Sequence, residues 1–104
     1  EWTESGTLGI AEGIETAMAA SALFDFPVWA AISSSMMKKW MPPPGCEEIV
    51  IFGDNDPKYG GQAAAYHLAE RLAAKNLPVG QVMIPQLPGE DWADEWLRRS
   101  TRRS

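Results

Sequence analysis

Three acidic residues that follow short apolar runs are the strongest candidates for chemistry in this sequence. Glu12 comes directly after the run LGIA, and Asp54 and Asp56 follow the run IVIF with only Gly53 between. Carboxylates held close together repel one another, so such an arrangement is costly unless a cation lies between them. Mg²⁺ favours one or two carboxylates together with phosphate oxygens. The three acids therefore predict a site for Mg²⁺, or for Mn²⁺ in its place.

The residues after the two aspartates fit phosphate chemistry as well. Gly60 and Gly61 would let the backbone pass close to a phosphate, with the N-terminus of the next helix facing it. They fit an ordinary loop before a helix equally well, and both interpretations stay open. Lys58 would either meet a phosphate or remain solvated. We include these three residues as possible additional members of the site.

The segment from Asp54 onwards also fits other interpretations. An Asp-x-Asp pair beside a glycine can simply form a turn that caps a helix. A calcium loop of the EF-hand kind is excluded, because its fifth, sixth and twelfth positions need an oxygen ligand, a glycine and a glutamate. Lys58, Tyr59 and Ala65 stand there instead. A phosphatase-type aspartate nucleophile stays open as a weaker alternative, since Lys58 stands where that family has threonine or valine.

Four short apolar runs must position these acids, and helical patterns separate them. The runs cover residues 8–11, 28–32 and 49–52, with a weaker fourth at 79–84 that Gly80 and Gln81 interrupt. Apolar residues at helical spacing cover 14–22 and 65–72. A short helix is expected at 91–99, with acids at its start and arginines at its end, as the helix dipole favours. Short apolar runs between amphipathic helices are typical of parallel strands buried on both faces. The sequence thus predicts an α/β domain with a four-stranded, mainly parallel, Rossmann-like sheet and helices on both faces.

The predicted sheet explains how acids that are distant in the sequence would meet. In open parallel sheets, ligands bind beyond the carboxyl ends of the strands, near the point where the strand order reverses. Glu12 ends the first run, and Asp54 and Asp56 end the third. If these two strands are neighbours, the three carboxylates converge on one small volume.

Composition excludes several classes of protein. One cysteine (Cys46) and one histidine (His67) rule out a disulfide framework and a zinc site of the usual kind. The lone cysteine fits a reducing cytosol, so we expect a cytoplasmic protein. No apolar run approaches the roughly 20 residues of a membrane span. The net charge of −5 does not indicate a broad nucleic-acid-binding surface, which is usually basic. Since the chain begins at Glu1 instead of methionine, we interpret it as a segment of a longer protein.

Three motifs, in order along the chain, resemble those of the Toprim domain that primases, topoisomerases and several nucleases share. They are EGIETAMAAS at 12–21, FGDNDPKYGGQAAA at 52–65 and LPGEDWADEWL at 87–97. The segments EGIETAMAA, PVWAAIS and DWADEWL are further similar to the Toprim regions of phage- and plasmid-encoded primases and primase–helicases. The resemblance places a Toprim domain at residues 1–100 and leaves 101–104 as an expected disordered tail.

The resemblance assigns a role to each acid. Glu12 matches the family's general acid or base, and Asp54 and Asp56 match its ligands for Mg²⁺ or Mn²⁺. Asp91 matches a later acid of primases that completes the metal cluster as a further ligand. Primases often carry an aspartate four places after the glutamate, where this sequence has Thr16. Glu15 stands one residue earlier, and whether it replaces that aspartate stays open.

The function implied by the resemblance is metal-dependent nucleotidyl transfer in primer synthesis during replication of a mobile element. The full-length protein would bind nucleotides and a single-stranded DNA template, with flanking zinc-binding or helicase domains and no membrane association. Two alternatives stay open: a Toprim nuclease, and a non-catalytic module that binds nucleotide or a partner. We expect the segment alone to be inactive or nearly so, with template contacts coming from neighbouring segments. The alternative is that the segment has a template-binding groove of its own, formed by Lys38, Lys39, Arg98 and Arg99.

Overall fold

The computed structural model describes residues 6–102, in which four strands alternate with four helices. The strands are β1 (Thr7–Ala11), β2 (Val28–Ala30), β3 (Glu48–Phe52) and β4 (Val79–Met83). The helices are α1 (Ile14–Phe24), α2 (Ser34–Lys39), α3 (Gly60–Ala74) and α4 (Trp92–Arg102). In this part of the chain, no helix has both the length and the apolar character needed to cross a membrane.

The strands form one four-stranded sheet in the order β2-β1-β3-β4, and every neighbouring pair is parallel. The predicted α/β fold with a four-stranded parallel sheet is therefore confirmed. β1 and β3 are neighbours, and Ala11 pairs with Phe52 at their carboxyl ends. Because the chain continues from β1 to β2 on one side and returns to β3 on the other, the strand order reverses between β1 and β3. The acids that follow these two strands thus lie at the switch point.

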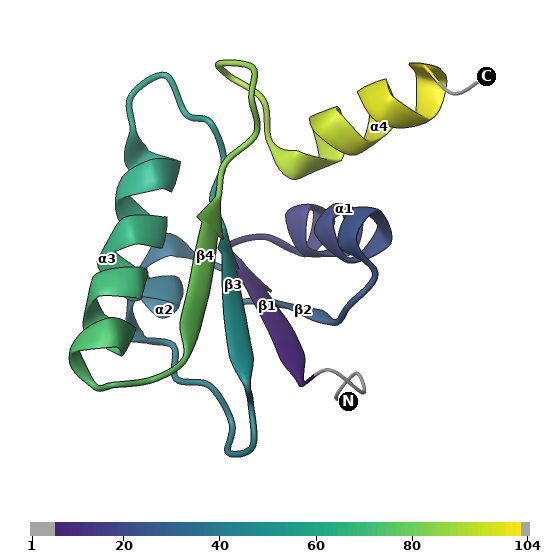
Figure 1. Ribbon diagram of the computed structural model, residues 1–104. Helices are drawn as coiled ribbons and strands as arrows, with labels where there is room; N and C mark the ends of the chain where they lie inside the picture. The colour runs from purple at the N-terminus through teal and green to yellow at the C-terminus, as the bar shows by residue number, and fades with distance from the viewer. Residues whose placement is uncertain (1–5, 103–104) are drawn as a thin grey trace.

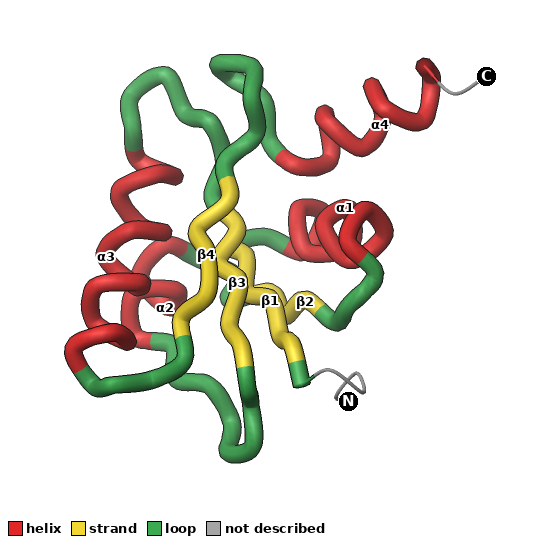
Figure 2. Tube along the Cα trace, in the orientation of Figure 1, coloured by secondary structure: helices red, strands yellow, loops and turns green. Residues whose placement is uncertain are grey.

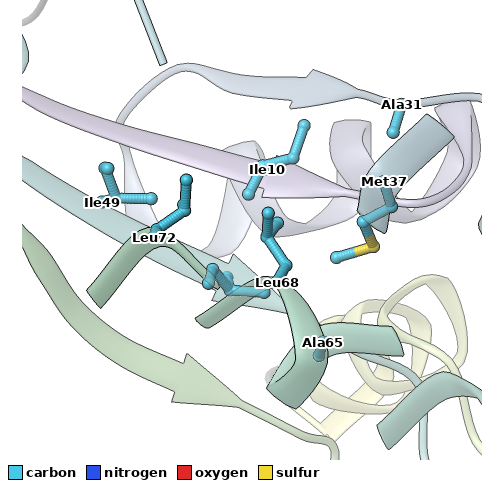
Figure 3. Close-up of a cluster of buried hydrophobic side chains, with 8 residues drawn as sticks. Ile10, Ala31, Met37, Ile49, Ala65, Leu68 and Leu72 are labelled. Carbon is cyan, nitrogen blue, oxygen red and sulfur yellow. The ribbon is translucent and has the colours of Figure 1, made fainter. Parts of the chain in front are cut away.

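Helices cover both faces of the sheet, as expected from the sequence. Figure 1 shows α2 and α3 on one face and α1 and α4 on the other, and Figure 2 shows the same layers by element type. Successive side chains of β3 point to opposite faces of the sheet, as in any strand. Ile49 and Ile51 join the cluster beneath α2 and α3, part of which Figure 3 shows. Val50 and Phe52 join the cluster beneath α1 and α4.

The short helix α2 was not predicted from the sequence. Ser33 caps its N-terminus by accepting a hydrogen bond from the backbone N–H of Met36 at 3.1 Å. Arg71 of α3 donates to the carbonyl of Lys38 at 2.6 Å, and also to the carbonyl of Trp40. A helix of six residues is too short to show a helical period, and its C-terminal cap comes from a distant part of the chain.

The ends of β2 and α4 differ from those expected. β2 ends at Ala30, because Ile32 has a left-handed backbone with φ of 84° and turns the chain toward α2. α4 continues through Arg102, so Thr101 and Arg102 extend the helix where a tail was expected. The Thr101 hydroxyl donates to the carbonyl of Leu97 at 2.9 Å. Residues 1–5 of the expected domain and 103–104 of the expected tail lie outside the described residues.

Candidate functional site

The acids singled out in the sequence surround one open pocket at the carboxyl edge of the sheet. Its volume is ≈ 360 Å³, and Glu12, Asp54, Asp56 and Asp91 all line it. Glu12 follows β1, the two aspartates follow β3, and Asp91 comes immediately before α4. The fold therefore brings together the four acids that the motifs indicated, from three separate loops.

Asp54 is half-buried and accepts two hydrogen bonds. Its carboxylate accepts a hydrogen bond from the Thr16 hydroxyl at 3.5 Å and another from the backbone N–H of Trp92. Burial raises the pKa of Asp54 from 3.8 to about 6, with help from the negative charges of Asp91 and then Glu12. Burial is the larger cause of the shift, and the neighbouring carboxylates add to it because like charges repel.

Asp56 has a structural role as well as a place in the pocket. One carboxylate oxygen accepts from the backbone N–H of Lys58 at 2.9 Å, and the other accepts from that of Gly60 at 3.1 Å. Asp56 therefore holds the turn at the start of α3, whose N-cap residue is Tyr59. An ionised carboxylate has about four lone-pair positions, so each oxygen retains capacity to bind a cation. Holding this turn and binding a metal ion are therefore compatible at Asp56.

Asp91 begins α4 through a reciprocal pair of hydrogen bonds with Asp94. Asp91 accepts from the N–H of Asp94 at 2.9 Å, and Asp94 accepts from the N–H of Asp91 at 3.1 Å. This arrangement is a capping box built with two aspartates. Because the next residue, Trp92, donates its N–H to Asp54, the cap fixes Asp91 beside Asp54. The spacing of acids at 91 and 94 is the sequence signal for this cap.

Gly60 and Gly61 allow α3 to begin against the acids. A Cβ at Gly61 would lie 2.8 Å from the carbonyl oxygen of Asp54, and one at Gly60 would lie 2.9 Å from a carboxylate oxygen of Asp56. Real Cβ atoms do not approach other atoms so closely. Gly61 meets the fixed backbone of Asp54 and so requires glycine, whereas at Gly60 the Asp56 side chain would have to move. Their predicted contact with a phosphate stays a prediction, as does that of the exposed Lys58.

Asn55 and Gln62, which were not predicted from the sequence, hold the loops of the site together. The backbone of Asn55 bonds to the neighbouring loop twice, with its N–H donating to Glu90 at 2.9 Å and its carbonyl accepting from Gly89 at 2.6 Å. The Asn55 side chain donates to the carbonyl of Pro85 at 2.8 Å and accepts from Gln62 at 3.2 Å. Asn55 therefore ties the loop that carries Asp91 to the loop that carries Asp54. The sequence signal for this role was the position of Asn55 between two acids. Successive residues of an extended segment point to opposite sides, so Asn55 is expected to face away from the acids.

Thr16 and Glu15 have different surroundings. Thr16, at the position where primases often have aspartate, is 6% exposed and donates to Asp54. Glu15 is exposed and lines a neighbouring pocket together with Thr16 and Asp91. Thr16 thus faces the acids as a neutral hydroxyl, and the replacement of the family's aspartate by Glu15 stays a prediction.

The residues of the pocket fit a partly hydrated Mg²⁺ ion. Within residues 6–102, no three His, Cys, Asp or Glu side chains lie in an arrangement ready to hold one metal ion together. Mg²⁺ does not require such a cage, because it usually keeps several waters and binds one or two carboxylates. Asp54 and Asp56 supply oxygen ligands of that kind, and the negative charges of Asp91 and Glu12 beside Asp54 favour a cation there.

The fold and the pocket define an α/β domain with an acidic site at the switch point of a parallel sheet. A family model described as Toprim domain matches residues 7–102, and the chain therefore belongs to the Toprim family. Toprim domains occur in primases, nucleases and topoisomerases, where they generally bind Mg²⁺ and are usually catalytic. No curated protein and no solved structure matches the chain.

Proposed function

We propose that this domain is the nucleotidyl-transfer core of a DNA primase or primase–helicase that acts in the replication of a mobile element. The observation that carries this proposal is the convergence of Glu12, Asp54, Asp56 and Asp91 on one pocket. The segment with Asp91 favours a primase in particular, because its sequence resembles primases. Its place beside Asp54 makes it available to the same reaction.

Glu12, Asp54 and Asp56 have distinct roles in the proposed reaction. Asp54 and Asp56 would hold Mg²⁺, which would supply stabilisation of the charge on the phosphates of the nucleotide. Glu12 lies at the end of β1 on the same pocket and would accept the proton of the attacking 3′ hydroxyl as a general base. The positive end of α4 is directed at Asp54 through the Trp92 N–H, which favours the ionised form of that carboxylate.

The basic residues support the expectation that the template is held largely from outside this segment. Lys38 and Lys39 belong to α2, whereas Arg98 and Arg99 belong to α4 on the opposite face of the sheet (Figure 1). Arg98 also forms an ion pair with Glu90 at 3.2 Å, and Arg99 forms one with the buried Glu95. These four residues therefore do not line one groove, and two of them have their charge offset within the chain.

We expect the purified chain to form the first phosphodiester bond slowly, and only with a divalent metal. The assay supplies single-stranded DNA, Mn²⁺ and four ribonucleotides, and separates dinucleotide and trinucleotide products by electrophoresis. Product should fall sharply in Glu12→Gln, because the general base is lost while the size of the side chain is kept. Glu70→Gln is the matched control, since Glu70 is an exposed acid of α3 away from the pocket.

A labelled DNA strand in the same reactions separates the alternatives. Cleavage of the strand that depends on metal and Glu12, without joining, would identify a nuclease and overturn the primase proposal. Metal binding with neither reaction would indicate a non-catalytic module. Equal product from Glu12→Gln and the unsubstituted chain would show that Glu12 has no part in the chemistry.

A further inference from the structure

Asn55, which lies between the two aspartates of the pocket, is bonded to the segment before α4 along its length. Its backbone N–H donates to the carbonyl of Glu90 at 2.9 Å, and its carbonyl accepts from the N–H of Gly89 at 2.6 Å. Its side-chain amide donates to the carbonyl of the buried Pro85 at 2.8 Å. Asn55 therefore fixes both ends of segment 85–90, and the residue that follows this segment is Asp91.

The side-chain amide of Asn55 is required in one orientation. Pro85 presents a carbonyl to it, so the NH₂ group of Asn55 must face Pro85 and its Oδ1 must face the other way. There, Oδ1 accepts from Nε2 of Gln62 at 3.2 Å. Gln62 is oriented in turn by the backbone of Asp56, whose N–H donates to its Oε1 at 3.3 Å. Among side chains of this size, asparagine alone both donates and accepts at neutral pH, so these contacts specify asparagine.

The segment that leads to Asp91 depends on such bonds for its position. Residues 86–89 are exposed, so they contribute little packing that would hold the segment. Glu90 also forms an ion pair with Arg98 at 3.2 Å, but solvent reaches both side chains and screens the attraction. Trp92 anchors the chain after Asp91, through its bond to the carbonyl of Gly53. The chain before Asp91 is held in place by Asn55.

We propose that Asn55 is a positioning residue for the cation: it sets how tightly the pocket binds a divalent metal ion, and it does so by holding Asp91 within reach. Asp54 and Asp56 are held by hydrogen bonds of their own, so the effect passes through Asp91. Residues that orient metal ligands from outside change metal affinity by roughly 10–100-fold. The inference rests on the cation binding of the proposed function, and it deepens that function by naming a residue that controls the binding.

A double-mutant cycle with Asn55→Ala and Asp91→Asn tests this route. The electron paramagnetic resonance signal of free Mn²⁺ gives the dissociation constant of each purified chain at neutral pH. Each single substitution should weaken Mn²⁺ binding about tenfold. The double variant should bind like Asp91→Asn alone, because Asn55 then has nothing left to position. Losses that multiply to about a hundredfold would show that Asn55 acts independently of Asp91, and the inference would be wrong.

Two control variants separate positioning from a general loss of stability. Val79→Ala removes part of the core at the end of β4 that is opposite the pocket. Gln86→Ala removes an exposed amide from the segment that Asn55 holds. Amide NMR spectra in EDTA establish that each variant is folded, and both should then bind Mn²⁺ like the unsubstituted chain. A tenfold loss in either control would show that affinity follows general loosening, which contradicts a specific role for Asn55.

Asn55→Asp provides a second test that does not depend on whether the alanine variant folds. It keeps the size of the side chain and the backbone bonds, and it loses the donation to Pro85. The added negative charge alone would tighten cation binding, whereas displacement of Asp91 would weaken it. We expect weaker binding. Equal or tighter binding would show that charge, and not the position of Asp91, controls the pocket, and would overturn the inference.

The same measurements distinguish this inference from the proposed function. Mn²⁺ binding that Asn55→Ala leaves unchanged would refute the role of Asn55 without affecting the primase proposal. Coupling between Asn55 and Asp91 in a chain that joins no nucleotides would overturn the primase proposal and leave this inference standing. An unsubstituted chain that binds no Mn²⁺ would overturn both.

Discussion

Replacing Trp92 by alanine is expected to lower the free energy of unfolding by about 3–5 kcal/mol. The side chain is 2% exposed, and its ring meets those of Phe24 and Phe52 edge to face at 5.5 and 5.6 Å between centroids. Its indole N–H donates to the carbonyl of Gly53 at 3.1 Å. Alanine would leave a cavity and a buried carbonyl without a partner. Since small domains are stable by only about 5–15 kcal/mol, this loss is large.

Trp96→Ala is the matched control for this prediction. Trp96 lies on the same helix but is 40% exposed, so its loss should cost only about 1–2 kcal/mol. Urea unfolding of the two variants measures the difference. Trp92→Ala should also weaken metal binding, because Trp92 docks the helix that places Asp91 beside Asp54. Equal destabilisation by the two substitutions would contradict the assignment of Trp92 as the anchor of α4.

Asp54→Asn is expected to raise the stability of the metal-free protein at neutral pH while abolishing metal binding. The pKa of Asp54 is about 6 in the folded protein and 3.8 as the ordinary value, so the native state binds more protons between these limits. Stability therefore falls as the pH rises from 3.8 to about 6. The full shift corresponds to about 3 kcal/mol, and solvent screening of this half-buried group reduces it to about 1–2 kcal/mol.

Urea unfolding in EDTA at pH 4 and pH 7 measures this effect. The variant should gain stability over the unsubstituted protein at pH 7 and much less at pH 4, where Asp54 is protonated in the folded state. Mg²⁺ should then stabilise the unsubstituted protein at pH 7 and leave Asp54→Asn unchanged. Glu70→Gln controls for the loss of one negative charge. A variant that is less stable than the unsubstituted protein at both pH values would show that the acids do not repel one another as described.

The fold could be predicted from the sequence because β1 and β3 carry continuous apolar runs. Residues 49–52 must be buried on both faces, which implies a parallel sheet with helices on either side, and the structure has this arrangement. α2 could not be predicted, since its stability comes from Ser33 and from the distant Arg71. The end of β2 was misplaced because Ile32, an ordinary strand residue by type, adopts positive φ.

The acids of the site could be predicted because their positions follow from where the apolar runs end. The network around them could not, since Asn55 bonds to residues of the loop between β4 and α4, 30 or more positions away. The packing role of Gly61 was also hidden, because it depends on how closely α3 approaches Asp54. The residue types in the sequence indicated the chemistry of the site. The fold determined which neighbouring residues surround the acids and modify that chemistry.

The measurement that tests the central claim most directly is a titration of the labelled protein with Mn²⁺, followed by backbone amide NMR. Mn²⁺ broadens the signals of nearby groups, so those of Gly13 and of residues 53–56 should weaken first, and excess Mg²⁺ should restore them. That result would place a divalent cation among Glu12, Asp54 and Asp56. First broadening at Glu47, Glu48 or Glu70, with the signals of the pocket unchanged, would contradict the account.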